Sequence, residues 1–98
     1  MTNLYIDNQA AYDNAIKSGA FDTATDVVIN NLPLLETIPS LPMARNVWLN
    51  NLPRLKTIAD LPKATYITLE NLPLLKTIPA LPKATRVYLE NLPLLGYK

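Results

Sequence analysis

The residues of this chain that could do chemistry are few, and the most suggestive are Glu70 and Glu90. They occupy the same place in two neighbouring copies of a twenty-residue repeat. Stacked copies would hold the two carboxyl groups about one strand spacing apart, ~4.8 Å, which is near the separation found in retaining glycosidases. On a shallow open surface neither carboxylate would be desolvated enough for acid–base work, and we expect Arg86 or a neighbouring lysine to neutralise them. We therefore expect no catalytic residue.

The amino-acid composition excludes most other kinds of catalytic, metal and cofactor site. The 98 residues include no His and no Cys, so the usual zinc sites and the Ser-His-Asp and Cys-His systems cannot form. The two glycines, Gly19 and Gly96, are too few for a glycine-rich phosphate loop. We expect no metal and no cofactor, and we predict that the protein is not an enzyme.

Charge and hydropathy restrict the partners. Nine Lys and Arg against eight Asp and Glu give a formal net charge of +1, which attracts neither nucleic acid nor anionic lipid strongly. The chain is 49% hydrophobic and 17% charged, so it should fold, but prolines and charges interrupt every stretch that could span a membrane. We expect no direct nucleic-acid partner and no membrane association. A cytoplasmic location is the expectation, because residues 1–19 do not read as a signal peptide and cysteine is absent.

The elements that must position these residues are tandem repeats. Residues 71–90, NLPLLKTIPALPKATRVYLE, match residues 51–70 at fourteen of twenty positions. Before each repeat's Asn, apolar and polar residues alternate, which predicts one strand of about three residues per unit and a short parallel sheet on one face. The rest of each unit has apolar residues every third position among prolines, which predicts irregular, 3₁₀ or polyproline-like return segments.

Equal positions in successive units should stack in rows. Leu32, Leu52, Leu72 and Leu92 illustrate an inward row that builds the core. Another row is made of asparagines, whose side chains we expect to satisfy backbone groups at the turns. This row contains Asn8, Asn31, Asn51, Asn71 and Asn91.

The chain is predicted to be one repeat domain. Residues 1–25 form an atypical N-terminal capping unit, residues 26–90 the tandem repeats, and residues 91–98 a truncated last repeat. The capping unit should contain one short α-helix at about 9–18.

Both ends of this helix carry signals. Asn8 can cap its start and Gly19 can end it, and Phe21 should plug the end of the unit. The buried side of the helix is expected to comprise Ala11, Tyr12, Ala15 and Ile16.

At the other end of the chain the last repeat stops before its return segment. Leu92 and Leu95 should lie on the open end of the core, where either Tyr97 covers them or two molecules associate end to end as a homodimer. Both arrangements stay open.

The repeats resemble the leucine-rich repeat family over roughly residues 26–95. The strand pattern Val/Ile-x-Leu-x-Asn is similar to the family's Leu-x-Leu-x-x-Asn, although the Asn comes one residue early. The segment Ile78-Pro79-Ala80-Leu81-Pro82 looks like the Leu-Pro-x-Leu-Pro of the short bacterial repeats. The resemblance implies a leucine-rich-repeat-like solenoid.

The outward rows are the candidate binding surface. A central row should run through Tyr5, Val28, Trp48, Thr68 and Tyr88 on the exposed side of the sheet, with polar residues on both sides. Aromatic residues and Arg concentrate at protein interfaces, whereas the alternative is that these rings only support cross-strand packing. The predicted protein-binding residues are Tyr5, Trp48, Tyr66, Thr68, Glu70, Arg86, Tyr88 and Glu90.

Three functions fit these features. The first is a non-enzymatic protein-binding module that uses the exposed sheet face. The second is a small inhibitor, acting in the bacterial or phage cytosol, that blocks a nucleic-acid-processing complex by placing Glu70, Glu90, Asp7 and Asp26 in its basic groove. The third is a structural or idealised repeat protein without a ligand.

Overall fold

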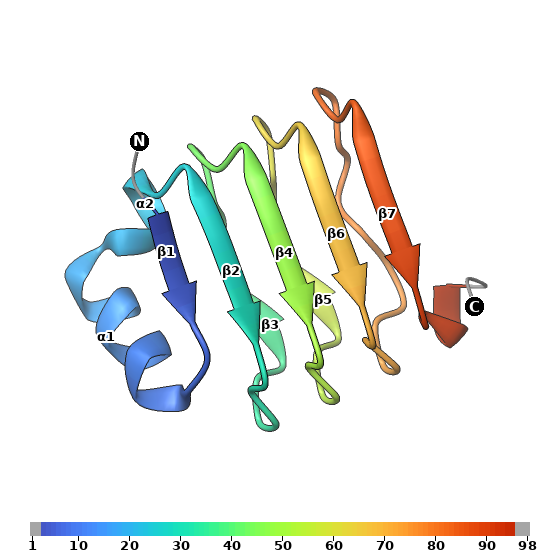
Figure 1. Ribbon diagram of the computed structural model, residues 1–98, viewed down its shortest axis with the longest axis horizontal. Helices are drawn as coiled ribbons and strands as arrows, with labels where there is room; N and C mark the ends of the chain where they lie inside the picture. Colours follow the sequence, from blue (N-terminus) through green and yellow to red (C-terminus); the bar gives the residue numbers. More distant parts are fainter. Residues whose placement is uncertain (1–2, 96–98) are drawn as a thin grey trace.

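Alternating apolar and polar residues build one strand in each unit. The computed structural model describes residues 3–95. Its five main strands lie side by side in chain order and form one parallel sheet (Figure 1). They are four or five residues long rather than the three expected: β1 (Asn3–Ile6), β2 (Asp26–Asn30), β4 (Asn46–Asn50), β6 (Tyr66–Glu70) and β7 (Arg86–Glu90).

The repeat length fixes the register of the sheet. Val47 pairs with Ile67, and Ile67 pairs with Val87, so each residue stands opposite its counterpart twenty positions away. The first pair of strands is offset by more, with Asn3 opposite Asp26, because the unit between them contains helices. The predicted rows of equal positions are therefore confirmed.

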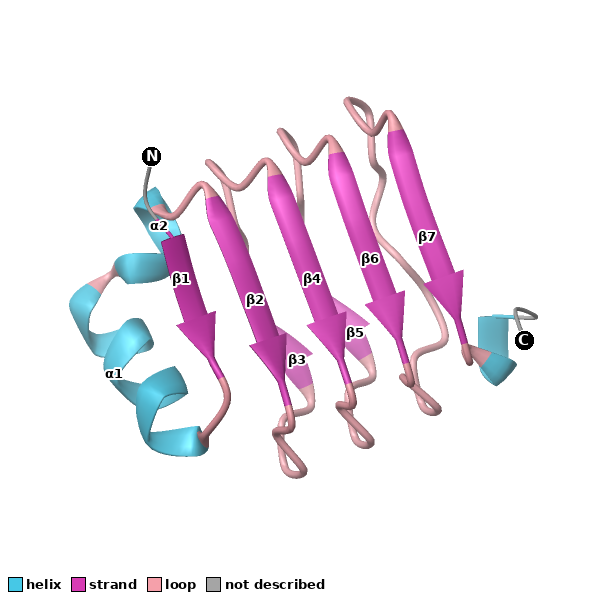
Figure 2. Ribbon diagram, viewed as in Figure 1, coloured by secondary structure: helices cyan, strands magenta, loops and turns pink. Residues whose placement is uncertain are grey.

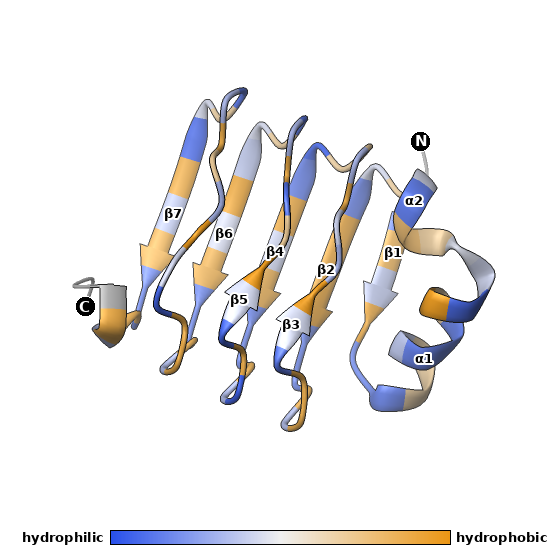
Figure 3. Cartoon of the chain, turned by 180° about the vertical axis from the view of Figure 1, so that it is seen from behind, coloured by the Kyte–Doolittle hydropathy of each residue, from blue (hydrophilic) through white to orange (hydrophobic). Residues whose placement is uncertain are grey.

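The return segments run along one face of the sheet, the face turned toward the viewer in Figure 3, and contain a second small sheet that the sequence did not predict. Strands β3 (Thr37–Ile38) and β5 (Thr57–Ile58) pair in parallel (Figure 2), and the N–H of Ala59 donates to the C=O of Ile38 at 3.0 Å. The next unit has Pro79 at the place of Ala59, and proline has no N–H to donate. This explains why Thr77 and Ile78 do not extend the pair.

The N-terminal unit contains the predicted helix and one more. Helix α1 (Gln9–Ser18) starts at Asn8, whose Oδ1 accepts the N–H of Ala11 at 2.8 Å. It ends at Gly19, which has the left-handed φ of 76° that glycine adopts without strain. The turn at Gly19 leads directly into α2 (Ala20–Thr23), a second helix that the sequence did not predict.

Helix α2 carries Phe21 into the core, as expected of the plug, and its ring lies 5.4 Å from that of Tyr12. On α1, Ala15 is buried and Tyr12 is half-buried, but Ile16 is exposed, so its predicted burial is wrong. The buried face of α1 is centred on Ala11 and Ala15, and Ile16 lies beyond the edge of that face.

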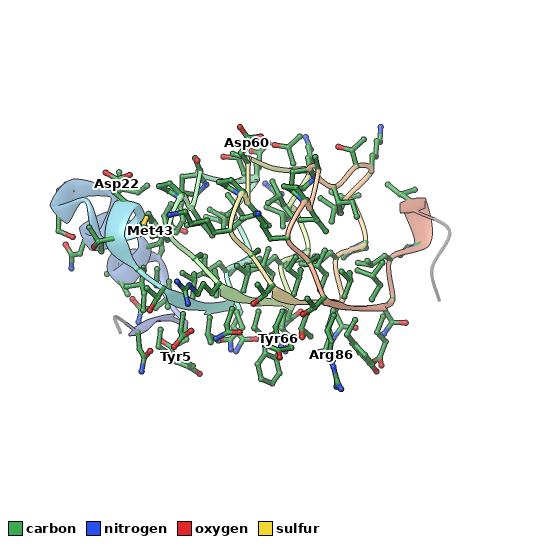
Figure 4. All side chains as sticks on the ribbon, turned by 90° about the horizontal axis from the view of Figure 1, so that it is seen from above. Tyr5, Asp22, Met43, Asp60, Tyr66 and Arg86 are labelled. Carbon is green, nitrogen blue, oxygen red and sulfur yellow. The ribbon has the colours of Figure 1, made fainter. Side chains whose placement is uncertain are left out.

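A continuous apolar core fills the space between the sheet and the return segments (Figure 4). It contains the whole predicted row Leu32, Leu52, Leu72 and Leu92, and no polar or charged residue among residues 3–95 is buried. Leu92, which was expected at the end of the core, is fully buried. The side chain of Leu95 lies outside the described part of the structure, as does Tyr97, so the two predicted arrangements of this end stay predictions. Helix η1 (Pro93–Leu95) follows Leu92.

The protein is thus a small α/β domain with a parallel sheet of five strands and two short helices. None of the helices formed by residues 3–95 has the length and apolar character needed to cross a membrane.

The asparagine row works differently from the prediction. Asn31, Asn51, Asn71 and Asn91 all have left-handed backbones, with φ between 56° and 59°. Their amides form two direct pairs: Asn51 Nδ2 donates to Asn31 Oδ1 at 2.8 Å, and Asn91 Nδ2 to Asn71 Oδ1 at 2.7 Å. Asn71 Nδ2 donates instead to Asn50 Oδ1 at 3.1 Å. Only Asn8 caps a backbone group as expected, because it alone directly precedes an α-helix. Asparagine suits the other positions because it tolerates the left-handed conformation.

Two substitutions at Asn71 separate the backbone and the side-chain contributions. Asn71→Ala should lower the free energy of unfolding by about 2 kcal/mol, since it loses the amide bonds and also strains the backbone. Asn71→Gly should lose only about 1 kcal/mol, because glycine adopts positive φ freely. Urea unfolding measures both, and equal losses in the two variants would contradict this explanation.

Candidate binding face

The pleat of the strands places every predicted site residue on the same side of the sheet. In a strand of five residues that begins facing outward, the first, third and fifth side chains point away from the core. Tyr5, Tyr66 and Arg86 are seen to project away from the core in Figure 4. We call this surface the candidate binding face and define it by Tyr5, Trp48, Tyr66, Thr68, Glu70, Arg86, Tyr88 and Glu90.

The structure brings seven of these residues together on β4, β6 and β7, whereas Tyr5 lies apart. Strand β2 separates β1 from β4, and its outward central residue is Val28. Tyr5 is therefore on the same face as Trp48 but two strands away from it. Tyr5 lies on the predicted face, and its separation from the cluster agrees with the predicted row, in which Val28 stands between Tyr5 and Trp48.

Three aromatic side chains form the apolar centre of the face. Trp48, Tyr66 and Tyr88 are 49%, 52% and 54% exposed. Trp48 and Tyr88 stand on either side of the smaller Thr68 in one row, and Tyr66 stands in the row beside it. About half of the surface of each of these residues is thus free for contact with another molecule.

Two shallow depressions adjoin Tyr66. The larger, of about 570 Å³, lies between β6 and β7 and is lined by Tyr66, Thr68, Arg86 and Tyr88 among others. The smaller, of about 190 Å³, lies over β2, β4 and β6 and adds Val28 to the surface, a residue not included in the predicted site. The only feature of the sequence that points to Val28 as a site residue is its place in the central row with Trp48 and Tyr88.

Hydrogen bonds hold two of the rings in place. Trp48 Nε1 donates to Glu70 Oε1 at 3.0 Å, and the hydroxyl of Tyr88 donates to Glu90 Oε2 at 2.6 Å. Glu70 and Glu90 stand directly opposite each other in the register. A ring that is already oriented loses less conformational entropy when it binds a partner.

Arg86 does not neutralise these glutamates, contrary to the expectation. Arg86 begins β7 and Glu90 ends it, so their Cα atoms are four residue steps of extended strand apart, roughly 13 Å. Among residues 3–95 the one ion pair joins Lys56 and Glu36, at 3.5 Å. The guanidinium of Arg86 is therefore unpaired within this part of the chain.

The pKa of Tyr88 is raised above its ordinary value. The main cause is its hydrogen bond to Glu90, followed by the negative charge of Glu90, with smaller contributions from desolvation and from Glu70. All of these favour the neutral phenol over the phenolate.

Glu90→Gln should lower the pKa of Tyr88 toward the ordinary value, because the amide carries no charge to repel a phenolate. NMR of ring-labelled tyrosine measures each phenol separately. Tyr12 serves as an internal control, since its raised pKa comes mainly from burial and should not move. An unchanged pKa of Tyr88 in this variant would refute the role assigned to Glu90.

Comparison with protein-family models, curated proteins and solved structures finds no match for this chain. Its function has to be inferred from the face itself.

The acidic residues of the face are the side chains on it that could hold a metal ion or form one acidic cluster. Within residues 3–95, no three acidic side chains lie close enough to share a metal ion. Asp26, at the start of its strand, accepts a hydrogen bond from Asn46 Nδ2 at 2.6 Å. It lies at the opposite end of the strands from Glu70 and Glu90, so the four acidic residues assigned to an inhibitor do not form one cluster.

Proposed function

We propose that this chain is a leucine-rich-repeat-like solenoid that binds another protein through the candidate binding face and catalyses no reaction. The observation that carries the proposal is the group of three half-exposed rings, Trp48, Tyr66 and Tyr88, on three adjacent strands. Large aromatic side chains that are held in place and still exposed are typical of the residues that dominate binding energy at protein interfaces.

Packing within the sheet does not account for these rings. The one close ring pair among residues 3–95 joins Tyr12 and Phe21 at the N-terminal unit, so the three rings of the face do not stack on one another. Folding alone does not require them to be aromatic, because the equivalent positions elsewhere in the sheet hold Val28, Thr68 and Asn46.

The absence of catalysis is supported by the state of the paired carboxylates. Glu70 and Glu90 lie on an open face, each is only half-buried, and each accepts a hydrogen bond from a neighbouring ring. Carboxylates that act as acid and base need distinct and partly desolvated surroundings. The arrangement suits recognition better than proton transfer.

An inhibitor with an acidic contact surface is a second candidate. Glu70 stands opposite Glu90, no cation among residues 3–95 pairs with either, and both raise the pKa of Tyr88. This end of the face therefore suits a basic groove in a partner. Steep weakening of binding with added salt would favour this candidate over an apolar contact.

Site-specific cross-linking tests the proposal. A photo-reactive phenylalanine derivative is introduced at Thr68, in the centre of the face, or at Thr77, on an exposed return segment. Irradiation in native extract should give an adduct with a second protein from Thr68 and none from Thr77. Equal adducts from both positions, or none from Thr68, would overturn the proposal, and the latter would favour a protein without a ligand. Adduct mass separates a partner from a second copy of the chain.

A further inference from the structure

Strand β7 forms the outer edge of the sheet built by residues 3–95, and the core is open beside it. Val87 is 42% exposed, whereas Val47, at the same position two units earlier, is 2% exposed. Leu89 and Leu81 are also only half-buried, although their counterparts in the earlier units are buried. Figure 1 shows no described element along the outer side of β7, and η1 lies past its carboxyl end.

Among residues 3–95, no backbone group bonds to the outer edge of β7. The N–H of Arg86 donates to the C=O of Thr65, and the C=O of Glu90 accepts the N–H of Asn71, so both residues face β6. Successive residues of a strand direct their backbone groups to opposite sides. Val87 and Leu89 therefore point their N–H and C=O groups outward, where another strand could pair with them.

The sequence of β7 is complementary to itself when it is read in the opposite direction. In an antiparallel pair centred on Tyr88, Arg86 stands opposite Glu90 of the second copy, and Val87 stands opposite its Leu89. None of the other five-residue strands has opposite charges at its two ends: β2 has Asp26 and Asn30, β4 has Asn46 and Asn50, and β6 has Tyr66 and Glu70.

We propose that two copies of this chain pair antiparallel through β7 and form a symmetric dimer. Val87 of each copy exchanges backbone hydrogen bonds with Leu89 of the other, and these apolar side chains cover the open side of both cores. The other residue pairs of this ladder are non-hydrogen-bonded pairs, whose side chains lie closer together. In these pairs Arg86 stands opposite Glu90 of the second copy, and the two Tyr88 rings stand opposite each other. This gives the unpaired guanidinium of Arg86 a partner.

The dimer would join the two sheets into one. Both candidate binding faces then lie on the same side, because residues that stand opposite each other in a ladder share a face. Such a dimer could engage two copies of a partner at once and gain affinity by avidity. The pairing itself does not depend on the proposed function.

Charge reversal tests this register without any other protein. Sedimentation equilibrium of the whole chain should show a dimer. Arg86→Glu places glutamates opposite each other and Glu90→Arg places arginines opposite each other, so each variant should dimerise at least about tenfold more weakly. Mixing the two variants should give a heterodimer, and the double variant R86E/E90R should recover the dimer of the original chain.

Any of the following results would overturn the proposed dimer. A monomeric original chain would exclude the dimer, and a dimer unaffected by the two charge reversals would place the contact elsewhere. Two weakened variants that fail to form a heterodimer would exclude the antiparallel register. Circular dichroism of each variant confirms that the fold persists, which is expected because both positions lie on the outward side of the strand. The outcome does not bear on whether the face binds a partner, since no partner is present.

Discussion

Replacing Leu52 with alanine is expected to lower the free energy of unfolding by about 3 kcal/mol. Leu52 is fully buried in the middle of the stack, and so are Leu32 and Leu72 at the same position in the units on either side. The side chains of such a row are held by backbones in fixed register, so they cannot move far into the space that a smaller residue leaves. The loss should include the free energy of transferring the removed methyl and methylene groups out of water, and most of the cost of the cavity that they leave.

Urea denaturation of the Leu52→Ala variant measures this loss, with Leu34→Ala as the matched control. Leu34 belongs to the same kind of segment but is 64% exposed, so its replacement should change stability by less than about 0.5 kcal/mol. A similar small effect at both positions would show that the rows do not carry the stability of the domain.

The parts of the fold that the sequence predicts correctly are those whose residue pattern recurs in every repeat. The repeat length fixes the register of the sheet, so the rows, the inward and outward faces and the strand order all follow from aligning the copies. Helix α1 was predictable from two local signals, the cap at Asn8 and the left-handed turn at Gly19. Each signal depends only on residues close to it in the chain.

The parts that were missed depend on contacts between segments. Strands β3 and β5 form because Ala59 has an N–H that reaches Ile38, while Pro79 has none, and this comparison has meaning only once the segments are known to be neighbours. Helix α2 is too short to have a periodic pattern, and it positions Phe21 against Tyr12. The exposure of Ile16 likewise depends on how α1 is rotated against the core.

For the candidate binding face, the sequence predicts which side chains share the surface but not how they are paired. Alternation along each strand is enough to place Trp48, Tyr66 and Tyr88 outward. Which partner each side chain takes depends on its reach and rotamer. Trp48 reaches across to Glu70 on the next strand, whereas Arg86 is too far along its strand to meet Glu90.

Replacing Trp48 with alanine is expected to weaken binding of the partner identified by cross-linking by about 2 kcal/mol, or roughly thirtyfold in Kd. The indole of Trp48 lines the smaller depression from β4, is half-exposed, and donates a hydrogen bond to Glu70. Its removal loses contact area and also leaves the Glu70 carboxylate without its donor. The fold should persist because the ring is not part of the buried core.

A phenylalanine at this position separates the two contributions. Trp48→Phe keeps an aromatic ring but cannot donate to Glu70, so its affinity should lie between those of the original chain and Trp48→Ala. An affinity of Trp48→Phe close to that of the original chain would show that ring area matters more, and one close to that of Trp48→Ala would show that the hydrogen bond to Glu70 matters more.

The decisive measurement is isothermal titration calorimetry of that partner with the original chain, with Trp48→Ala and with Leu34→Ala. Leu34 supplies the control because it is an exposed apolar residue of a return segment, away from the sheet face. We predict that Trp48→Ala raises Kd about thirtyfold and that Leu34→Ala leaves it unchanged. Binding by Trp48→Ala as tight as that of the original chain would contradict the assignment of the sheet face as the binding surface.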